Sequence, residues 1–208
     1  GAVVEEIPNP IYPDEVREVE LTTTRNGGEG EMYGYELAYQ QFFDFLPSPW
    51  DGLGVQGTFT KIKSSGVPHN EVDYDNADWA NGGENDTGAR VNLNNVPLQG
   101  QSEETVNFTL MYEKYDWQLR AAYNWRSKYL LTTRDVISKY PLWSDDIGML
   151  DASIMYNIND NITVGLQGTN LTNEQTKTLA ILNDEGMTAG RSWFVMDRRY
   201  TLSLRAKF

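Results

Sequence analysis

The stretch that decides the fold is RRYTLSLRAKF, residues 198–208. Side chains of a β-strand alternate between two faces, so positions two apart share a face. One face here is apolar and comprises Tyr200, Leu202, Leu204, Ala206 and Phe208. The other is polar and comprises Arg199, Thr201, Ser203, Arg205 and Lys207. An amphipathic strand with an aromatic last residue is typical of the closing strand of a transmembrane β-barrel, although a strand of a soluble sandwich shows the same alternation.

The same alternation of apolar and polar residues recurs along the chain. It occurs in residues 33–43, 53–60, 105–112, 117–126, 150–157 and 162–167. No long amphipathic helical segment is found. The sequence therefore predicts an all-β fold, an antiparallel sheet with one apolar and one polar face.

Composition excludes several classes of protein. The 208 residues suffice for one domain of ordinary size. No run approaches the roughly 18 apolar residues that a transmembrane helix needs. The net charge of -13 argues against a nucleic-acid partner. The absence of cysteine removes disulfides, thiol nucleophiles and cysteine metal sites.

The predicted connections between strands alternate in length. Short turns are expected at residues 46–52, 114–116 and 157–161, and long links at 65–101, 129–149 and 170–192. Short turns at one end and long loops at the other are the layout of an outer-membrane barrel. Aromatic residues cluster at both strand ends, as the two interfacial girdles of a barrel require. At the short-turn ends these are Phe43, Phe45, Trp50, Tyr112, Trp117, Tyr156 and Phe208, and at the long-loop ends Tyr33, Tyr35, Trp125, Tyr129 and Trp193.

The number of strands depends on residues 16–43. If the glycine-rich tract 25–30 is a hairpin turn, eight strands result and the chain can close a small barrel. If that tract is a bulge in one long strand, seven strands result. Bacterial single-chain barrels carry an even number, so the chain would then be part of a larger barrel. Residues 1–13, with three prolines, are expected to form a loop.

Several motifs together carry a family resemblance. They are NGGEGEMYGYELAYQQFFDFLP at 26–47, PLQGQS at 97–102, YNWR at 123–126, LDAS at 150–153, NLTN at 170–173 and the terminal Phe208. In this order they resemble the TonB-dependent outer-membrane receptors, and most of all their proteobacterial, glycan-uptake-like branch. The match runs over nearly the whole chain, from about residue 16.

The resemblance implies a fold, a location and partners. The fold would be an antiparallel transmembrane β-barrel segment, about seven C-terminal strands of a 22-stranded plugged barrel. Residues 1–15 would be an extracellular loop remnant and 16–208 the C-terminal part of the barrel, with 16–43 as one long strand. The location would be the bacterial outer membrane. Partners would be outer-membrane lipid, the missing N-terminal plug and barrel part, TonB acting through the plug, the barrel-assembly machinery, and a small-molecule or glycan ligand.

The function implied is active import, not catalysis. The assembled receptor would import a scarce nutrient, an oligosaccharide, with energy supplied through TonB. No cofactor is expected, and His69 is the single histidine, without a partner that the sequence can place. Three alternatives stay open: a ferric siderophore receptor of the same family, a complete eight-stranded outer-membrane barrel with a structural or adhesive role, and a soluble carbohydrate-binding β-sandwich.

Candidate site residues fall into four groups. The lumen face would turn these residues to the plug: Glu36, Glu103, Glu113, Arg120, Arg126, Arg199, Arg205 and Lys207. Ligand contact in the long loops is predicted for Tyr74, Trp79, Asn81, Asn85, Trp143, Asp145 and Asp146, because aromatic rings stack on sugars and amides bond hydroxyls. A Ca²⁺ site at Asp73, Asp75 and Asp78 is the weaker interpretation of an acidic loop. The assembly signal would comprise Tyr200, Leu202, Leu204 and Phe208.

Overall fold

The computed structural model describes residues 2–8, 16–22, 30–65, 97–133, 135, 138, 140–183 and 185–207. Nearly all of its regular structure is antiparallel strand. Among these residues, none belongs to a helix of the length and apolar character needed to cross a membrane.

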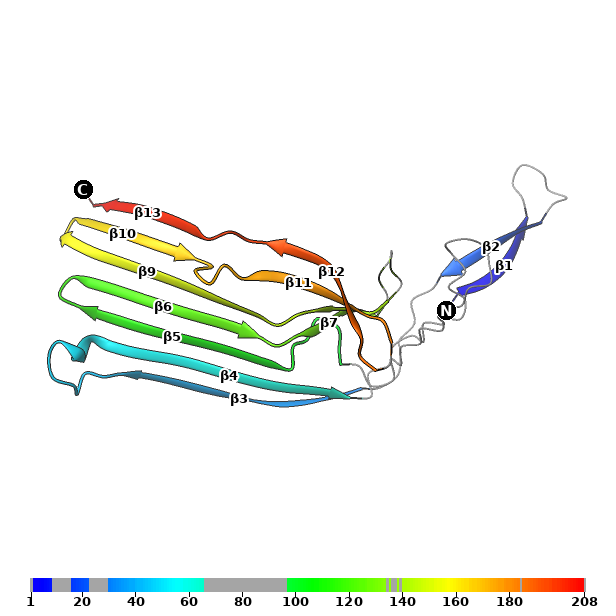
Figure 1. The fold of residues 1–208 in the computed structure, drawn as a ribbon, viewed down its shortest axis with the longest axis horizontal. Coiled ribbons are helices and arrows are strands. Elements are labelled where there is room, and N and C mark those ends of the chain that lie inside the picture. Colours follow the sequence, from blue (N-terminus) through cyan, green and yellow to red (C-terminus); the bar gives the residue numbers. More distant parts are fainter. Residues whose placement is uncertain are drawn as a thin grey trace.

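Seven strands form the main sheet, in the order β13-β10-β9-β6-β5-β4-β3 (Figure 1). Their bounds are β3 Glu31–Phe42, β4 Leu53–Ser65, β5 Glu104–Lys114, β6 Trp117–Arg126, β9 Ile147–Asn159, β10 Ile162–Thr169 and β13 Arg199–Ala206. Neighbouring strands are paired antiparallel throughout. The sequence prediction of an antiparallel all-β fold is confirmed.

A second, four-stranded sheet continues the first. Its order is β12-β11-β8-β7, and the strands are β7 Tyr129–Thr132, β8 Leu142–Ser144, β11 Gln175–Ile181 and β12 Thr188–Val195. Along the chain, each of these strands is separated from a strand of the main sheet by only two to five residues. Figure 1 shows β12 in line with β13. The prediction that residues 129–149 and 170–192 form loops is therefore wrong, because both ranges contain strands. The alternation of apolar and polar residues is interrupted between the strands of the two sheets, so the sequence did not reveal these strands.

The short connections lie at one end of the sheet, and Figure 1 places the C-terminus at that end. Tyr115 and Asp116 have φ angles of 53° and 66° between the paired residues Lys114 and Trp117. Positive φ at both central residues defines the two-residue hairpin turn that matches strand twist. The connection between β3 and β4 contains a short 3-10 helix, η1, at Trp50–Gly52.

The N-terminal part differs from expectation in two ways. A strand, β1 at Ala2–Pro8, is present where a loop was predicted, and it pairs with β2 at Val16–Thr22. The prediction was wrong because the prolines stand only at the end of β1 and after it, while Val3, Val4 and Ile7 favour a strand. The single strand over 16–43 is also wrong, because β2 pairs with β1 and β3 starts at Glu31.

Strand register gathers the apolar side chains on one face of the main sheet. Residues directly opposite each other share a face. One transverse row is Leu37, Phe59, Val106, Trp125 and Gly148, and another is Val55, Leu110, Ala121, Ala152, Gly168 and Tyr200. No described segment packs over this surface, which we call the apolar face: Leu202 is 82% exposed and Leu204 73%.

The apolar face rules out the sandwich alternative. Two sheets of a sandwich bury their apolar faces against each other. Among the described residues the buried hydrophobic ones are Leu130, Leu142 and Ala180, all in the four-stranded sheet. The closed eight-stranded barrel is wrong as well, because the described main sheet has seven strands and no pairing joins β13 to β3.

Asn170 holds the junction between the two sheets. It is buried, has a φ of 51°, and its amide N–H donates to Asp151 Oδ1 at 2.9 Å. Its side-chain Nδ2 donates to the carbonyl oxygens of Glu174, at 3.1 Å, and Met196, while its Oδ1 accepts from the Glu174 N–H at 2.8 Å. Asparagine tolerates the left-handed conformation and bonds nearby backbone, which explains this residue in the NLTN motif.

Replacing Asn170 with alanine should destabilise the protein by about 1–3 kcal/mol, because two carbonyl groups and one N–H lose their partner in a partly buried place. Denaturant unfolding in detergent micelles, followed by tryptophan fluorescence, measures the change. Asn124→Ala, at an exposed position near the end of β6, is the matched control and should shift the midpoint little. Equal shifts for the two variants would contradict a structural role specific to Asn170.

Candidate functional site

The face opposite the apolar face is polar, and we call it the polar face. Three neighbouring rows on β3 to β6 cross its middle. They comprise Glu36, Thr60, Thr105 and Arg126; Ala38, Thr58, Asn107 and Asn124; and Gln40, Gln56, Thr109 and Ala122. The Asn107 Nδ2 donates to Thr58 Oγ1 at 3.0 Å. Amide and hydroxyl groups therefore dominate this wall, with one carboxylate and one guanidinium in the rows.

Register places the predicted lumen residues on the polar face. Six of them lie on strands, at positions that alternate with the apolar side chains: Glu36, Glu113, Arg120, Arg126, Arg199 and Arg205. Glu103 precedes β5, and its carbonyl accepts from the Ile62 N–H at 2.8 Å. The neighbouring Glu104 instead forms an ion pair with Lys61 at 2.6 Å. The contact of these residues with a plug stays a prediction.

Arg126 forms its contacts within the chain's own sheet and the segment that precedes β5. Its Nε donates to Ser102 Oγ at 2.8 Å and its Nη2 to the Gly100 carbonyl at 3.2 Å. Its guanidinium lies 3.9 Å from the centroid of the Tyr129 ring, a cation–π contact. Ser102 is 2% exposed, and its hydroxyl donates a hydrogen bond to the Ser127 carbonyl oxygen at 2.8 Å. Sequence reasoning missed this cluster, although the PLQGQS motif marks its position.

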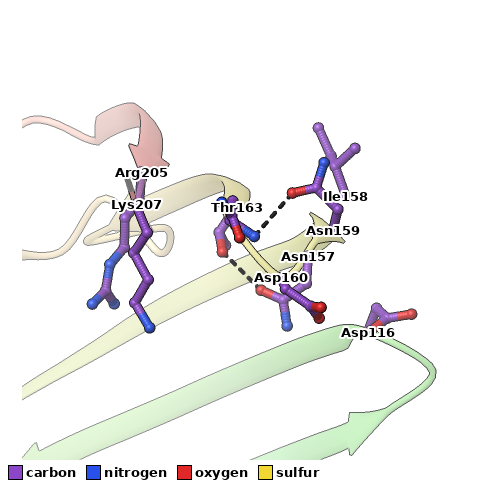
Figure 2. A pocket seen from close by; sticks show the side chains of 9 residues that line it. Asp116, Asn157, Ile158, Asn159, Asp160, Thr163, Arg205 and Lys207 are labelled. Carbon is purple, nitrogen blue, oxygen red and sulfur yellow. Dashed lines mark hydrogen bonds between the residues drawn. The ribbon is translucent and has the colours of Figure 1, made fainter.

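A polar pocket of about 530 Å³ lies at the short-turn end (Figure 2). Arg205 of β13 and Lys207, just after it, border the pocket together with Asp116 and Asp160 of two hairpin turns. The Thr163 hydroxyl donates to Asn157 Oδ1 at 2.8 Å inside it. Two of the predicted lumen cations are thus brought together with acidic side chains from two turns.

Trp143 is a partly buried residue of the four-stranded sheet. It occupies the middle of β8, between its register partners Leu130 and Leu179. Its ring nitrogen is buried and has no hydrogen-bond partner among the described residues, and the ammonium group of Lys128 lies 5.7 Å from its ring centroid. Strands β7 and β11 thus flank Trp143 on both sides, and its contact with a ligand stays a prediction.

Asp145 and Asp146 separate β8 from β9. The Asp145 N–H donates to the Lys177 carbonyl at 2.9 Å. Asp146 is exposed and accepts a hydrogen bond from Trp125 Nε1 at 3.2 Å. Asp146 therefore retains acceptor capacity toward the long-loop side, next to an aromatic ring.

The remaining predicted residues lie outside the described part of the chain. These are Tyr74, Trp79, Asn81 and Asn85, the calcium candidates Asp73, Asp75 and Asp78, and Phe208. Among the residues that the structure describes, no group of three or more His, Asp or Glu side chains is suited to a metal ion. Tyr200, Leu202 and Leu204 lie on the apolar face of β13.

Asp135 ties the link between β7 and β8 to β12. Its Oδ2 accepts the Ser138 N–H and the Ser138 hydroxyl, each at 2.8 Å, and Arg191 Nε at 3.2 Å. The Ser138 backbone N–H foremost, and then its hydroxyl and the Arg191 guanidinium, lower the pKa of Asp135 from 3.8 to about 2. Each donor favours the ionised carboxylate.

Acid should weaken the contacts of Asp135 with Ser138 and Arg191. The pKa of Asp135 is lowered in the folded protein, so its stabilisation is complete above about pH 4, the pKa of an unfolded aspartate, and is lost as the pH falls toward 2. The protection factor of the Ser138 amide, the exchange rate of an unfolded amide divided by its own at the same pH, should therefore fall over that window. Asp135→Asn should show fast exchange already at pH 7, whereas Asp160→Asn, in a hairpin turn, should behave as the parent. Slow Ser138 exchange in Asp135→Asn would contradict the role of the carboxylate.

Comparison with known proteins agrees with this architecture. The family model described as "TonB dependent receptor-like, beta-barrel" matches residues 4–171. No curated protein and no solved structure matches the chain. The matched span includes six of the seven strands of the main sheet, all but β13, together with the polar-face rows. The open seven-stranded sheet is therefore a segment of an antiparallel β-barrel, and the chain belongs to the TonB-dependent receptor family, a family of outer-membrane transporters.

Proposed function

We propose that this chain forms part of an active transporter of the bacterial outer membrane that imports an oligosaccharide. Energy reaches the receptor through TonB acting on a plug domain, which the polar face would contact from the lumen side. Outer-membrane lipid covers the apolar face. Membership in the family supports the transporter, and the side chains of the polar face support the substrate class.

The observation that carries the substrate class is the neutral character of the middle of the polar face. Gln40, Gln56, Asn107 and Asn124 present amide groups from four adjacent strands. An amide group offers both donors and an acceptor, which suits the hydroxyl groups of a sugar. A ferric siderophore is commonly anionic and would be favoured by a cluster of cations, whereas these rows contain Arg126 alone, already bound to Ser102 and Gly100.

The charge of the chain supports the same substrate class. Its net charge is -13, so a strongly anionic ligand meets long-range repulsion on approach. A neutral oligosaccharide does not. The role of Tyr200, Leu202, Leu204 and Phe208 as the signal for the barrel-assembly machinery stays a prediction.

The test is growth of the native host with and without the gene of the full-length receptor. We expect the deletion strain to lose uptake of an oligosaccharide as carbon source and to keep uptake of ferric siderophores as iron source. A protonophore should abolish the uptake in the parent strain. Loss of growth on ferric siderophores alone would overturn the substrate class, and uptake that resists the protonophore would overturn the dependence on TonB.

Within that receptor, the double variant Asn107→Ala/Asn124→Ala should reduce oligosaccharide uptake at least several-fold, because both amides lie in one row of the polar face. Val106→Ala, one position away but on the apolar face, is the matched control and should leave uptake unchanged. Outer-membrane levels of all variants are compared on immunoblots, so that a loss of uptake is separated from a loss of protein.

A further inference from the structure

The apolar face contains a hollow near its short-turn end. Its volume is about 500 Å³, within the range of roughly 300–1,000 Å³ typical of small-molecule sites. Trp50 of η1 borders one end, and Leu110, Leu119 and Ile154 form its walls. The lining is almost wholly apolar. The hollow is therefore a continuation of the apolar face.

The hollow exists because two small residues face each other in the sheet. Ala121 on β6 is the register partner of Ala152 on β9, and both line the hollow. The next row toward the short-turn end pairs Leu119 with Ile154, whose larger side chains stand above the alanines. The next row on the other side of the alanines pairs Tyr123 with Leu150, again larger side chains.

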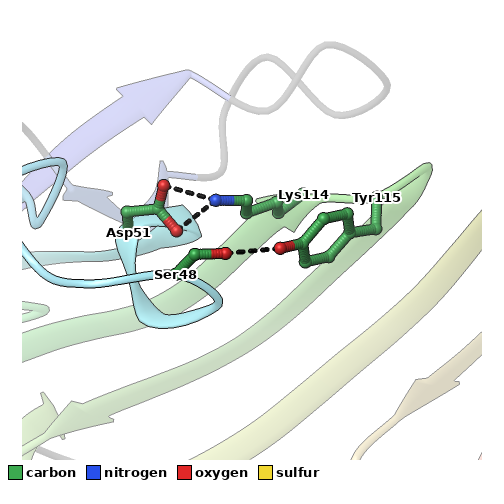
Figure 3. A network of polar contacts seen from close by, with 4 residues as sticks. All are labelled: Ser48, Asp51, Lys114 and Tyr115. Carbon is green, nitrogen blue, oxygen red and sulfur yellow. Dashed lines mark hydrogen bonds and ion pairs between the residues drawn. The ribbon is translucent and has the colours of Figure 1, made fainter.

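The turn that brings Trp50 to the hollow is fixed by polar contacts (Figure 3). Asp51 follows Trp50 in the turn. Lys114 Nζ forms an ion pair with both carboxylate oxygens of Asp51. The Ser48 hydroxyl is hydrogen-bonded to the Tyr115 hydroxyl. These contacts tie the connection between β3 and β4 to the hairpin between β5 and β6, so Trp50 is held in place beside the hollow.

The same contacts set the depth of the hollow in the membrane. An ion pair such as Asp51–Lys114 belongs at the level of the lipid headgroups, because charges in hydrocarbon are costly. Leu110 lies four residues from Lys114 along β5, about 13 Å at 3.3 Å per residue. The hollow therefore extends from the interface into the hydrocarbon of the leaflet on the short-turn side.

We propose that this hollow binds one acyl chain of a phospholipid from that leaflet. Water is disfavoured there, because the lining offers almost no hydrogen-bond partners and the hollow opens toward hydrocarbon. An empty hollow would forfeit van der Waals contacts along its whole surface. A flexible acyl chain supplies these contacts, and its headgroup lies at the level of Lys114 and Tyr115. The proposal needs the apolar face to meet lipid, and it does not depend on which substrate is imported.

The experiment uses the full-length protein in phosphatidylethanolamine vesicles that contain a phospholipid brominated on its acyl chains. Bromine quenches tryptophan fluorescence on contact. The chain has six tryptophans, so the contribution of Trp50 is taken as the difference from Trp50→Phe. The filled variant Ala121→Leu/Ala152→Leu replaces the hollow by side chains, and Ala206→Leu, on the apolar face of β13 outside the hollow, is the matched control.

We expect quenching of Trp50 in the parent protein to rise linearly with the fraction of brominated lipid, as for a single bound chain. The filled variant should lower this quenching several-fold, and Ala206→Leu should leave it unchanged. Unchanged quenching in the filled variant, no quenching in the parent, or the same loss in Ala206→Leu would each overturn the proposal. Circular dichroism checks the fold, and Ala152→Val serves as a milder filling variant if the double variant does not fold.

Discussion

Backbone hydrogen bonding in hydrocarbon is the constraint on which this structure depends. A spanning segment must satisfy every N–H and C=O within protein, and strands can do so only through continuous ladders with their neighbours. The ladders from β3 to β13 meet this demand across the sheet. The same ladders fix the register, and a slip of one residue would carry a whole strand's apolar side chains to the lumen. The apolar face and the polar face both follow from that register.

Much of this arrangement could be predicted from alternation. The apolar positions of the last strand, Tyr200, Leu202 and Leu204, lie on the face shared with Leu166 and Ile154, as period two requires. The short turns and the side of the sheet on which Arg120, Arg126 and Arg205 lie were predicted for the same reason. Period-two patterning is informative here because each face meets a different medium, so nearly every residue of a strand is constrained.

Other features left little signal in the sequence. Continuation of β10 into β11 was missed because Asn170 and Asn173, with positive φ, interrupt the alternation there. The pairing of β1 with β2 joins two segments whose own patterns are weak. The ties of Arg126 to Ser102 and of Asp135 to Arg191 span 24 and 56 residues and depend on which strands become neighbours. The hollow depends on two alanines 31 positions apart, Ala121 and Ala152, that register alone brings face to face.

The most direct test of the account is a cysteine scan along β6, since the chain has no cysteine of its own. Single cysteines at positions 118–125 of the membrane-embedded protein are treated with a water-soluble thiol reagent. The account predicts labelling at Gln118, Arg120, Ala122 and Asn124, on the polar face, and protection at Leu119, Ala121, Tyr123 and Trp125, on the apolar face. Labelling without a period of two, or with the two sets exchanged, would contradict it.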